Sequence, residues 1–119
     1  MKKILLFFIL ILFCFVGNTF SETRIQPTIT AYTSNQLVKR GDAKVYSATF
    51  VSTAANGFFC LLDALTNTNS GTTVTDMKAE GSEATSANSK FYDFSNKPIE
   101  FSTGLYIVVS NGFLTLKYE

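Results

Sequence analysis

Apolar and polar residues alternate in short runs from about residue 22 onward, and Gly, Asn and Ser separate the runs. Thr, Val, Ile, Phe and Tyr dominate these runs, which is typical of β-strands, and no helix-period stretch exceeds about two turns. The pattern predicts one all-β domain over residues 22–119, a two-sheet antiparallel β-sandwich that is jelly-roll-like and has about seven or eight strands. The expected strands are 25–33, 44–53, 58–65, 72–78, 90–94, 99–101, 105–110 and 113–118, with 36–39 as a further short candidate.

Two apolar runs flank the pair Asn111-Gly112 near the end of the sequence. Asn-Gly is the preferred pair of a two-residue hairpin turn, so the pattern predicts a hairpin in which Val109 faces Leu114. Because side chains alternate along a strand, six residues of this hairpin then share one buried face. These six are Leu105, Ile107, Val109, Leu114, Leu116 and Tyr118.

The opposite side of this predicted hairpin is unusually apolar for a solvent-facing surface. It carries Tyr106, Val108, Phe113, Thr115 and Lys117. We predict this side as the candidate interaction surface, and contact with a covering loop or incomplete coverage of the sheet is the alternative interpretation.

A second pair, Asn56-Gly57, predicts another hairpin, with a three-residue loop and Gly57 as a left-handed bulge. This register pairs Phe50 with Leu62 and turns Cys60 inward. We expect the Cys60 thiol to be buried and inert. The alternative is a bridge to another chain, because Cys60 would be the one cysteine left after removal of the N-terminal segment.

The first residues have the layout of a secretory signal peptide. Lys2 and Lys3 precede an apolar run over 4–17, which as a helix covers about 21 Å and so falls short of the roughly 30 Å hydrocarbon core. We expect an apolar signal helix within residues 1–21, cleavage after Ser21, and a secreted or extracytoplasmic protein. The alternative is a protein that stays anchored by residues 4–17.

The charge of the chain makes a nucleic-acid partner unexpected. Residues 1–21 hold two of the ten basic residues and none of the nine acidic ones, so their removal changes the net charge from +1 to −1. The remaining basic residues are scattered rather than clustered. We therefore expect a protein or surface-polymer partner, self-association included, and membrane contact only through the signal segment during export.

The sequence offers little catalytic chemistry. Histidine is absent, which removes the usual general base and the commonest metal ligand, and no cofactor or metal motif is present. Asp76, Glu80 and Glu83 lie close in sequence and suit glycoside hydrolysis or calcium binding if they converge. Their polar, Gly-interrupted run favours a solvated strand end and loop. We expect a protein without cofactor or metal that is not an enzyme, with a carboxylate-dependent hydrolase as an alternative.

Two further features each have two interpretations. Asp63 lies in an apolar run, where it either points outward at the strand end or is buried beside a cation. Arg40-Gly41-Asp42 matches a tripeptide that some adhesion receptors recognise, but Gly-Asp is also an ordinary turn pair, and a turn is the expected role.

The second half of the chain resembles small β-sandwich proteins of tailed-phage virions, of the decoration, head-fibre or spike type. The similarity rests on a strand that passes through Ile99, Phe101, Gly104 and Leu105 into the segment with Asn111-Gly112 and ends near Tyr118, and the segment VYSATFVSTAANGFFCLLDA is similar to their first hairpin. The resemblance implies an assembly subunit. From the residues alone, the first expectation is a non-enzymatic exported module for binding, adhesion or structure.

Overall fold

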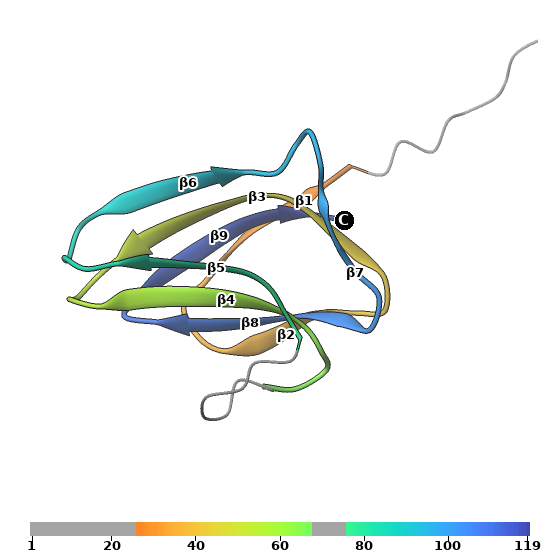
Figure 1. Cartoon of the computed structure of the whole chain (residues 1–119), viewed down its shortest axis with the longest axis horizontal. Coiled ribbons are helices and arrows are strands. Elements are labelled where there is room, and N and C mark those ends of the chain that lie inside the picture. Colours follow the sequence, from red (N-terminus) through yellow and green to blue (C-terminus); the bar gives the residue numbers. More distant parts are fainter. Residues whose placement is uncertain (1–25, 68–75) are drawn as a thin grey trace, which may run out of the picture.

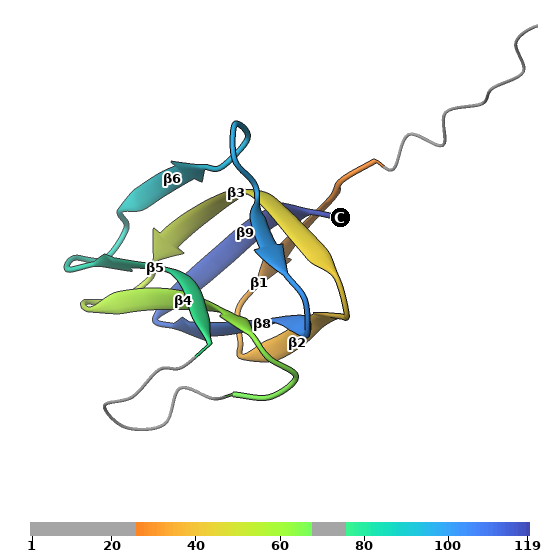
Figure 2. The ribbon, with the colours of Figure 1, turned by 45° about the vertical axis from the view of Figure 1, so that its right-hand side comes forward.

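The computed structural model describes residues 26–67 and 76–119, which form two facing β-sheets (Figures 1 and 2). The predicted signal helix within residues 1–21 lies outside the described residues, as do residues 72–75 of one predicted strand. The described part contains no helix that is long and apolar enough to cross a membrane.

Nine strands make up the two antiparallel sheets in the described residues. They are β1 (Thr28–Tyr32), β2 (Gln36–Arg40), β3 (Ala43–Ser52), β4 (Gly57–Asp63), β5 (Met77–Glu83), β6 (Ser89–Asp93), β7 (Ile99–Phe101), β8 (Gly104–Ser110) and β9 (Gly112–Tyr118). Sheet A has the order β1-β9-β3-β6, with β7 also paired to β3, and sheet B has the order β2-β8-β4-β5. The prediction of an all-β fold with two antiparallel sheets is confirmed.

Most predicted strands agree with the observed ones, and the strand predicted over 72–78 is displaced. Strand β5 begins at Met77 and includes the polar segment around Gly81, which the sequence pattern assigned to a loop. β5 lies at the edge of sheet B and pairs only with β4. An edge strand with one half-covered face tolerates Gly and charged residues that a central strand does not.

Both predicted Asn-Gly hairpins are wrong, because each Asn-Gly pair connects the two sheets instead of two neighbours in one sheet. β8 pairs with β2 and β4, whereas β9 pairs with β1 and β3. β3 and β4 are likewise in different sheets. The four strands β3, β4, β8 and β9 are thereby central strands, each with a backbone ladder on both sides. The inward apolar side chains of β3 lie against those of β4, and the inward apolar side chains of β8 lie against those of β9.

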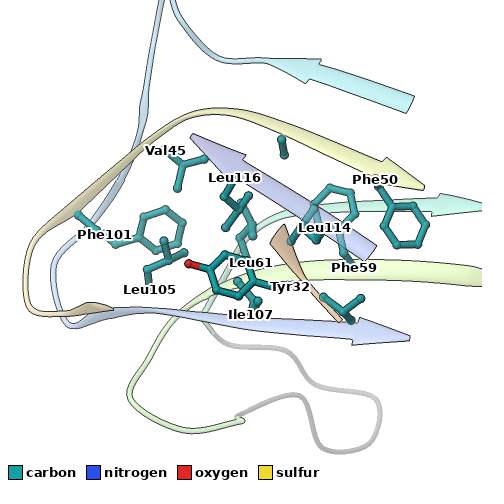
Figure 3. Close-up of a cluster of buried hydrophobic side chains, with 13 residues drawn as sticks. Tyr32, Val45, Phe50, Phe59, Leu61, Phe101, Leu105, Ile107, Leu114 and Leu116 are labelled. Carbon is teal, nitrogen blue, oxygen red and sulfur yellow. The ribbon is translucent and has the colours of Figure 1, made fainter. Parts of the chain in front are cut away.

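The main core lies between the sheets. Figure 3 shows Leu114 and Leu116 of β9 above Leu105 and Ile107 of β8, and all four side chains are fully buried. Val109 is also in this core, and Tyr118 is partly buried against it. Five of the six residues predicted to share a buried face are therefore buried, although they face each other from opposite sheets.

Aromatic rings continue this core toward the edge formed by β5 and β6. The ring of Phe59 lies 5.5 Å from that of Phe50 and 5.3 Å from that of Tyr92, measured between centroids. Tyr92, from β6, lies over Gly81 of β5, where a side chain would collide with the tyrosine ring. The two edge strands are thus packed together across the sandwich.

The two Asn-Gly corners touch each other at one end of the sandwich. Asn56 and Asn111 adopt the left-handed conformation, with φ of 57° and 52°, while neither following glycine has a positive φ. A hairpin turn of type I′ needs positive φ at both positions, so the backbone itself excludes that turn. The glycines serve close approach instead, since a Cβ on Gly57 would lie 2.8 Å from the Asn111 carbonyl oxygen.

We expect Gly112→Ala to lower the free energy of unfolding by about 2 kcal/mol or more, since over-packing carries a cost of this size. A Cβ at this position would lie 2.5 Å from the Val51 carbonyl oxygen, and backbone cannot move aside as a side-chain end can. Chemical denaturation measures the change.

Asn111→Gly is the matched control at the same corner. Glycine adopts the φ of 52° without strain, so this variant should change the free energy of unfolding by less than about 1 kcal/mol. A tolerated Gly112→Ala together with a damaging Asn111→Gly would contradict the steric role of the glycine.

Candidate functional site

The outer face of sheet A forms a broad surface whose residues follow from the strand register. Paired residues of antiparallel strands point to the same side, so the outward positions line up in rows across the sheet. We call this surface the outer A face. It consists of Ile29, Ala31, Ser47, Thr49, Val51, Ser89, Phe91, Asp93, Phe113, Thr115 and Lys117.

Large apolar side chains are exposed on the outer A face. Ile29 is 67% exposed, Phe91 64% and Phe113 41%. These are three of the five large hydrophobic residues that are exposed in the described part of the chain, and the other two are Phe58 and Leu65. A contiguous apolar surface rimmed by polar groups marks an interaction site more often than scattered apolar residues do.

The structure separates the five residues predicted as one interaction surface. Phe113, Thr115 and Lys117 lie on the outer A face, whereas Tyr106 and Val108 belong to sheet B. The prediction of a single face is wrong because it assumed a hairpin, in which β8 and β9 would share a sheet.

Val108 is also less accessible than a contact surface requires, and Tyr106 is partly buried. Val108 is 5% exposed and lies in a second apolar cluster on the outer side of sheet B. This cluster contains Cys60, Leu62, Ala64 and Val108, with Met77 and Tyr106 packed against it.

Sequence reasoning missed Phe91 and Ile29. Phe91 and Tyr92 are neighbours in one strand, so one of them must face outward. Both are large aromatic residues, so the two residues alone do not indicate which one it is. Asp93 has the same orientation as Phe91, and its polarity is the signal that assigns Phe91 to the solvent side. Ile29 lies beside Lys117 in the register, which no local pattern reveals.

Two opposite charges lie in one row of the outer A face. Lys117 and Asp93 both pair with Ser47, so they flank the central strand β3 on either side. The pKa of Asp93 is lowered, first by the side-chain hydrogen bond from Ser95, whose backbone N–H also donates, and then by the positive charge of Lys117. Both charged side chains are accessible to solvent and therefore to a partner.

A pocket of about 590 Å³ lies at the end of the sandwich opposite the two Asn-Gly corners. Positive and negative side chains both line it, together with the buried apolar residues Ala43 and Phe101. The charged residues that line it are Lys39, Asp42, Lys44, Asp63, Lys78, Glu100 and Glu119. Because neither sign prevails, the pocket does not define the charge of a ligand.

Asp63 anchors this end of the sandwich. Its carboxylate accepts hydrogen bonds from the backbone N–H groups of Ser102 (3.1 Å), Thr103 (2.7 Å) and Gly104 (3.3 Å), and Lys78 Nζ lies 3.7 Å away. Desolvation pushes the pKa of Asp63 upward, but these hydrogen bonds outweigh it, so the pKa is lower than usual. Asp63 therefore both ends a strand and lies beside a cation, and it ties β4 to the turn before β8.

The Arg40-Gly41-Asp42 tripeptide forms the tight connection from β2 to β3. Gly41 has a φ of 72°, and its N–H donates to the Thr103 carbonyl oxygen at 3.0 Å. Arg40 is the last residue of β2 and pairs with Gly104. The tripeptide is thus built into the backbone of the turn, which is the role expected from its sequence.

The carboxylates considered for hydrolysis do not converge. Glu80 pairs with Cys60 on the outer side of sheet B, while Glu83 pairs with Gly57 and points to the opposite side of β5. Asp76 precedes β5, and its carbonyl oxygen accepts the Asp63 N–H at 2.8 Å. Within residues 26–67 and 76–119, no three His, Cys, Asp or Glu side chains lie close enough to hold a metal ion.

Cys60 is buried, as predicted, but on the other side of its strand. It is 5% exposed and belongs to the outer cluster of sheet B. β4 pairs with β5 and β8 and not with β3, and it turns Phe59 and Leu61 toward the main core, so Cys60 between them faces the other side. Burial raises the pKa of the thiol, and the nearby charge of Glu80 raises it further. Both effects disfavour the reactive thiolate.

Comparison with models of known protein families, with curated proteins and with solved structures finds no match to this chain.

We expect Asp63→Asn to lower the free energy of unfolding at neutral pH by about 1–3 kcal/mol, because the charged acceptor of three backbone N–H groups is lost. Since the folded pKa is below the usual 3.8, the stabilisation by Asp63 is present above that value and is lost as the pH falls through the folded pKa. Denaturation at several pH values should therefore show the difference between the proteins shrinking in acid.

The exposed Asp42→Asn is the control for removal of one negative charge, and it should change the free energy of unfolding by less than about 0.5 kcal/mol. Equal effects of the two substitutions at every pH would contradict the anchoring role of Asp63.

We also expect the native protein to react with a thiol reagent at least about a hundredfold more slowly than the denatured protein. The Cys60 thiol is buried in the native protein, and burial disfavours its ionisation to the reactive thiolate. Absorbance of a released thiolate product follows the reaction. Equal rates in the native and denatured states would show that the second cluster opens freely.

Proposed function

We propose that this chain is an exported, non-enzymatic β-sandwich module that binds a protein or a surface polymer through the outer A face. The observation that carries the proposal is the exposure of Ile29, Phe91 and Phe113 on one side of one sheet. Thr49 and Val51 lie between Phe91 and Phe113, whereas Lys117 lies directly beside Ile29 and Asp93 lies in the edge strand β6. Aromatic anchors with a polar rim are typical of contact surfaces between macromolecules.

Export is proposed from the N-terminal sequence. Lys2 and Lys3, the apolar run over 4–17 and the small residues around Ser21 support a signal peptide that is cleaved after Ser21. The buried thiol of Cys60 is compatible with an oxidising compartment, since it is withheld from exchange reactions.

A role as a virion-type or extracellular assembly subunit is the second candidate, and the order of the strands favours it. With β7 set apart, β1-β9-β3-β6 faces β2-β8-β4-β5. Of the connections between consecutive strands of these eight, those from β2 to β3 and from β6 to β8 cross between the sheets, and all others join neighbours or facing partners. This order supports a jelly-roll assignment, and jelly rolls are frequent among viral capsid proteins and lectins. In such a subunit the outer A face would contact other subunits.

A photo-crosslinking amino acid at position 91 tests the proposed contact in the cells or particles that make the protein. We expect it to capture a partner molecule on irradiation, because Phe91 is 64% exposed on the outer A face, in the edge strand β6. Mass spectrometry or sugar analysis of the adduct identifies the partner as a protein or a polymer.

The matched control carries the same amino acid at position 58, which is exposed on the outer side of sheet B. We expect much less adduct from position 58. Failure to obtain any adduct from position 91, or equal adducts from both positions, would contradict the proposal.

A further inference from the structure

The chain contains two Asn-Gly pairs, Asn56-Gly57 and Asn111-Gly112, and Asn-Gly is the pair at which asparagine deamidates most readily. The glycine nitrogen attacks the side-chain carbonyl carbon of the asparagine, the bond from that carbon to the amide nitrogen breaks, and ammonia leaves with the proton of the glycine nitrogen. Water then opens the cyclic imide at either carbonyl carbon and gives aspartate or isoaspartate. Glycine favours this attack because it has no side chain to hinder its nitrogen.

The backbone conformation of both asparagines opposes the attack. Asn56 has a φ of 57° and Asn111 a φ of 52°, which places them in the left-handed region, where ψ is about 30–60°. At such a ψ, the nitrogen of the following residue lies nearly opposite the asparagine Cβ across the Cα–C bond. Cyclisation needs the two on the same side of that bond. Each asparagine is therefore held in a conformation from which it cannot form the imide.

Hydrogen bonds and close packing prevent Asn111 from rotating out of this conformation. Its carbonyl oxygen accepts the Thr53 N–H at 2.8 Å, and its side-chain Nδ2 donates to the Ala55 carbonyl oxygen at 3.2 Å. Rotation about the Cα–C bond of Asn111 would turn its carbonyl oxygen away from Thr53. It would also displace Gly112, where even a Cβ would lie 2.5 Å from the Val51 carbonyl oxygen.

Asn56 is held by the same corner. Its N–H donates to the Ala84 carbonyl oxygen at 3.2 Å. The following Gly57 packs so closely that a Cβ there would lie 2.8 Å from the Asn111 carbonyl oxygen and 3.0 Å from the Cβ of Ser52. Rotation at either asparagine thus requires the two Asn-Gly corners to separate.

We propose that Asn56 and Asn111 are deamidation sites that the folded protein keeps unreactive, and that they react only in molecules whose two Asn-Gly corners have opened. The proposal is independent of the proposed function, because it concerns the chemical lifetime of the module and not its partner. The reaction makes the opening irreversible. Aspartate at position 111 places a carboxylate where Nδ2 now donates to the Ala55 carbonyl oxygen, and isoaspartate lengthens the backbone inside the corner.

Mass spectrometry of digested protein measures deamidation at each asparagine after incubation in mildly alkaline buffer. The protein is expressed from the complete sequence and incubated either folded or unfolded in guanidinium chloride. We expect both Asn-Gly sites to react at least about tenfold more slowly in the folded protein, because local opening populates a minor state of about 10% or less. A short peptide with the sequence Ser-Asn-Gly-Phe, incubated in both solvents, corrects for the effect of guanidinium chloride on the reaction itself.

Gly112→Ala tests the opening of the corner in the folded protein. It loosens the contact with Val51 and also removes the second Asn-Gly pair, so the reaction of Asn56 is the one to follow. Asn56 should react about 5–30-fold faster, the factor that one or two kcal/mol gives in an equilibrium between two states. Asp63→Asn, at the other end of the sandwich, is the matched control and should leave the rate at Asn56 within about twofold, since local openings at separate places are independent.

Four outcomes would overturn the proposal. Equal corrected rates in the folded and unfolded protein would show that the corner gives no protection, and an unchanged rate at Asn56 in Gly112→Ala would show that the corner does not control it. Equal acceleration by Gly112→Ala and Asp63→Asn would assign the reaction to global unfolding. Recovery of the native circular dichroism by protein with isoaspartate at position 111 would contradict the irreversible step. None of these measurements involves the outer A face, so each leaves the proposed function standing.

Discussion

The two connections that carry the Asn-Gly pairs join the sheets, and they are held against each other at one end of the sandwich. The Thr53 N–H donates to the Asn111 carbonyl oxygen at 2.8 Å, where the connection from β3 to β4 crosses the connection from β8 to β9. Gly57 and Gly112 allow this approach because neither has a side chain that would meet the other connection. These two connections join the four central strands in facing pairs, and the inward side chains of those strands form most of the main core between the sheets.

A second set of contacts holds the neighbouring loop against the same crossing. The hydroxyl group of Ser52, which is buried at the end of β3, donates to the Thr85 carbonyl oxygen at 2.6 Å, and the Ala87 N–H donates to the Ser52 carbonyl oxygen at 2.8 Å. Ala87 has a φ of 62°, a conformation that alanine adopts only where surrounding contacts impose it. Three connections are therefore interdependent at this end of the sandwich, and Asp63 has the equivalent role at the other end.

The sequence predicted which residues are buried more reliably than it predicted their neighbours. Alternation correctly placed Leu105, Ile107, Val109, Leu114 and Leu116 inside, since period two follows from strand geometry alone. The same alternation is satisfied whether two strands pair side by side or stack face to face. Two features distinguish these arrangements: the φ values of Asn111 and Gly112, and the strands that pair with β8 and β9. Those pairing strands are distant in sequence, so local patterns do not reveal them.

The candidate site was predictable to the extent that it depended on one strand. Phe113, Thr115 and Lys117 alternate within β9 and lie on the outer A face, whereas Phe91 and Ile29 join them through long-range pairing. The outer sides of the two sheets then differ in a way that local patterns do not show. On the outer side of sheet B, Leu62 and Val108 are withdrawn from solvent and Phe58 is exposed, while on sheet A Ile29, Phe91 and Phe113 are all in contact with solvent.

This difference assigns separate physical roles to the apolar and charged residues of the outer A face. Phe91 and Phe113 provide area that gains free energy on leaving water, but apolar contact alone does not fix an orientation. Lys117 and Asp93 lie on the same face, and exposed charges of this kind contribute little affinity but oppose arrangements that bring like charges together. A surface that carries both kinds of residue restricts the orientation of a bound molecule more than apolar residues alone would.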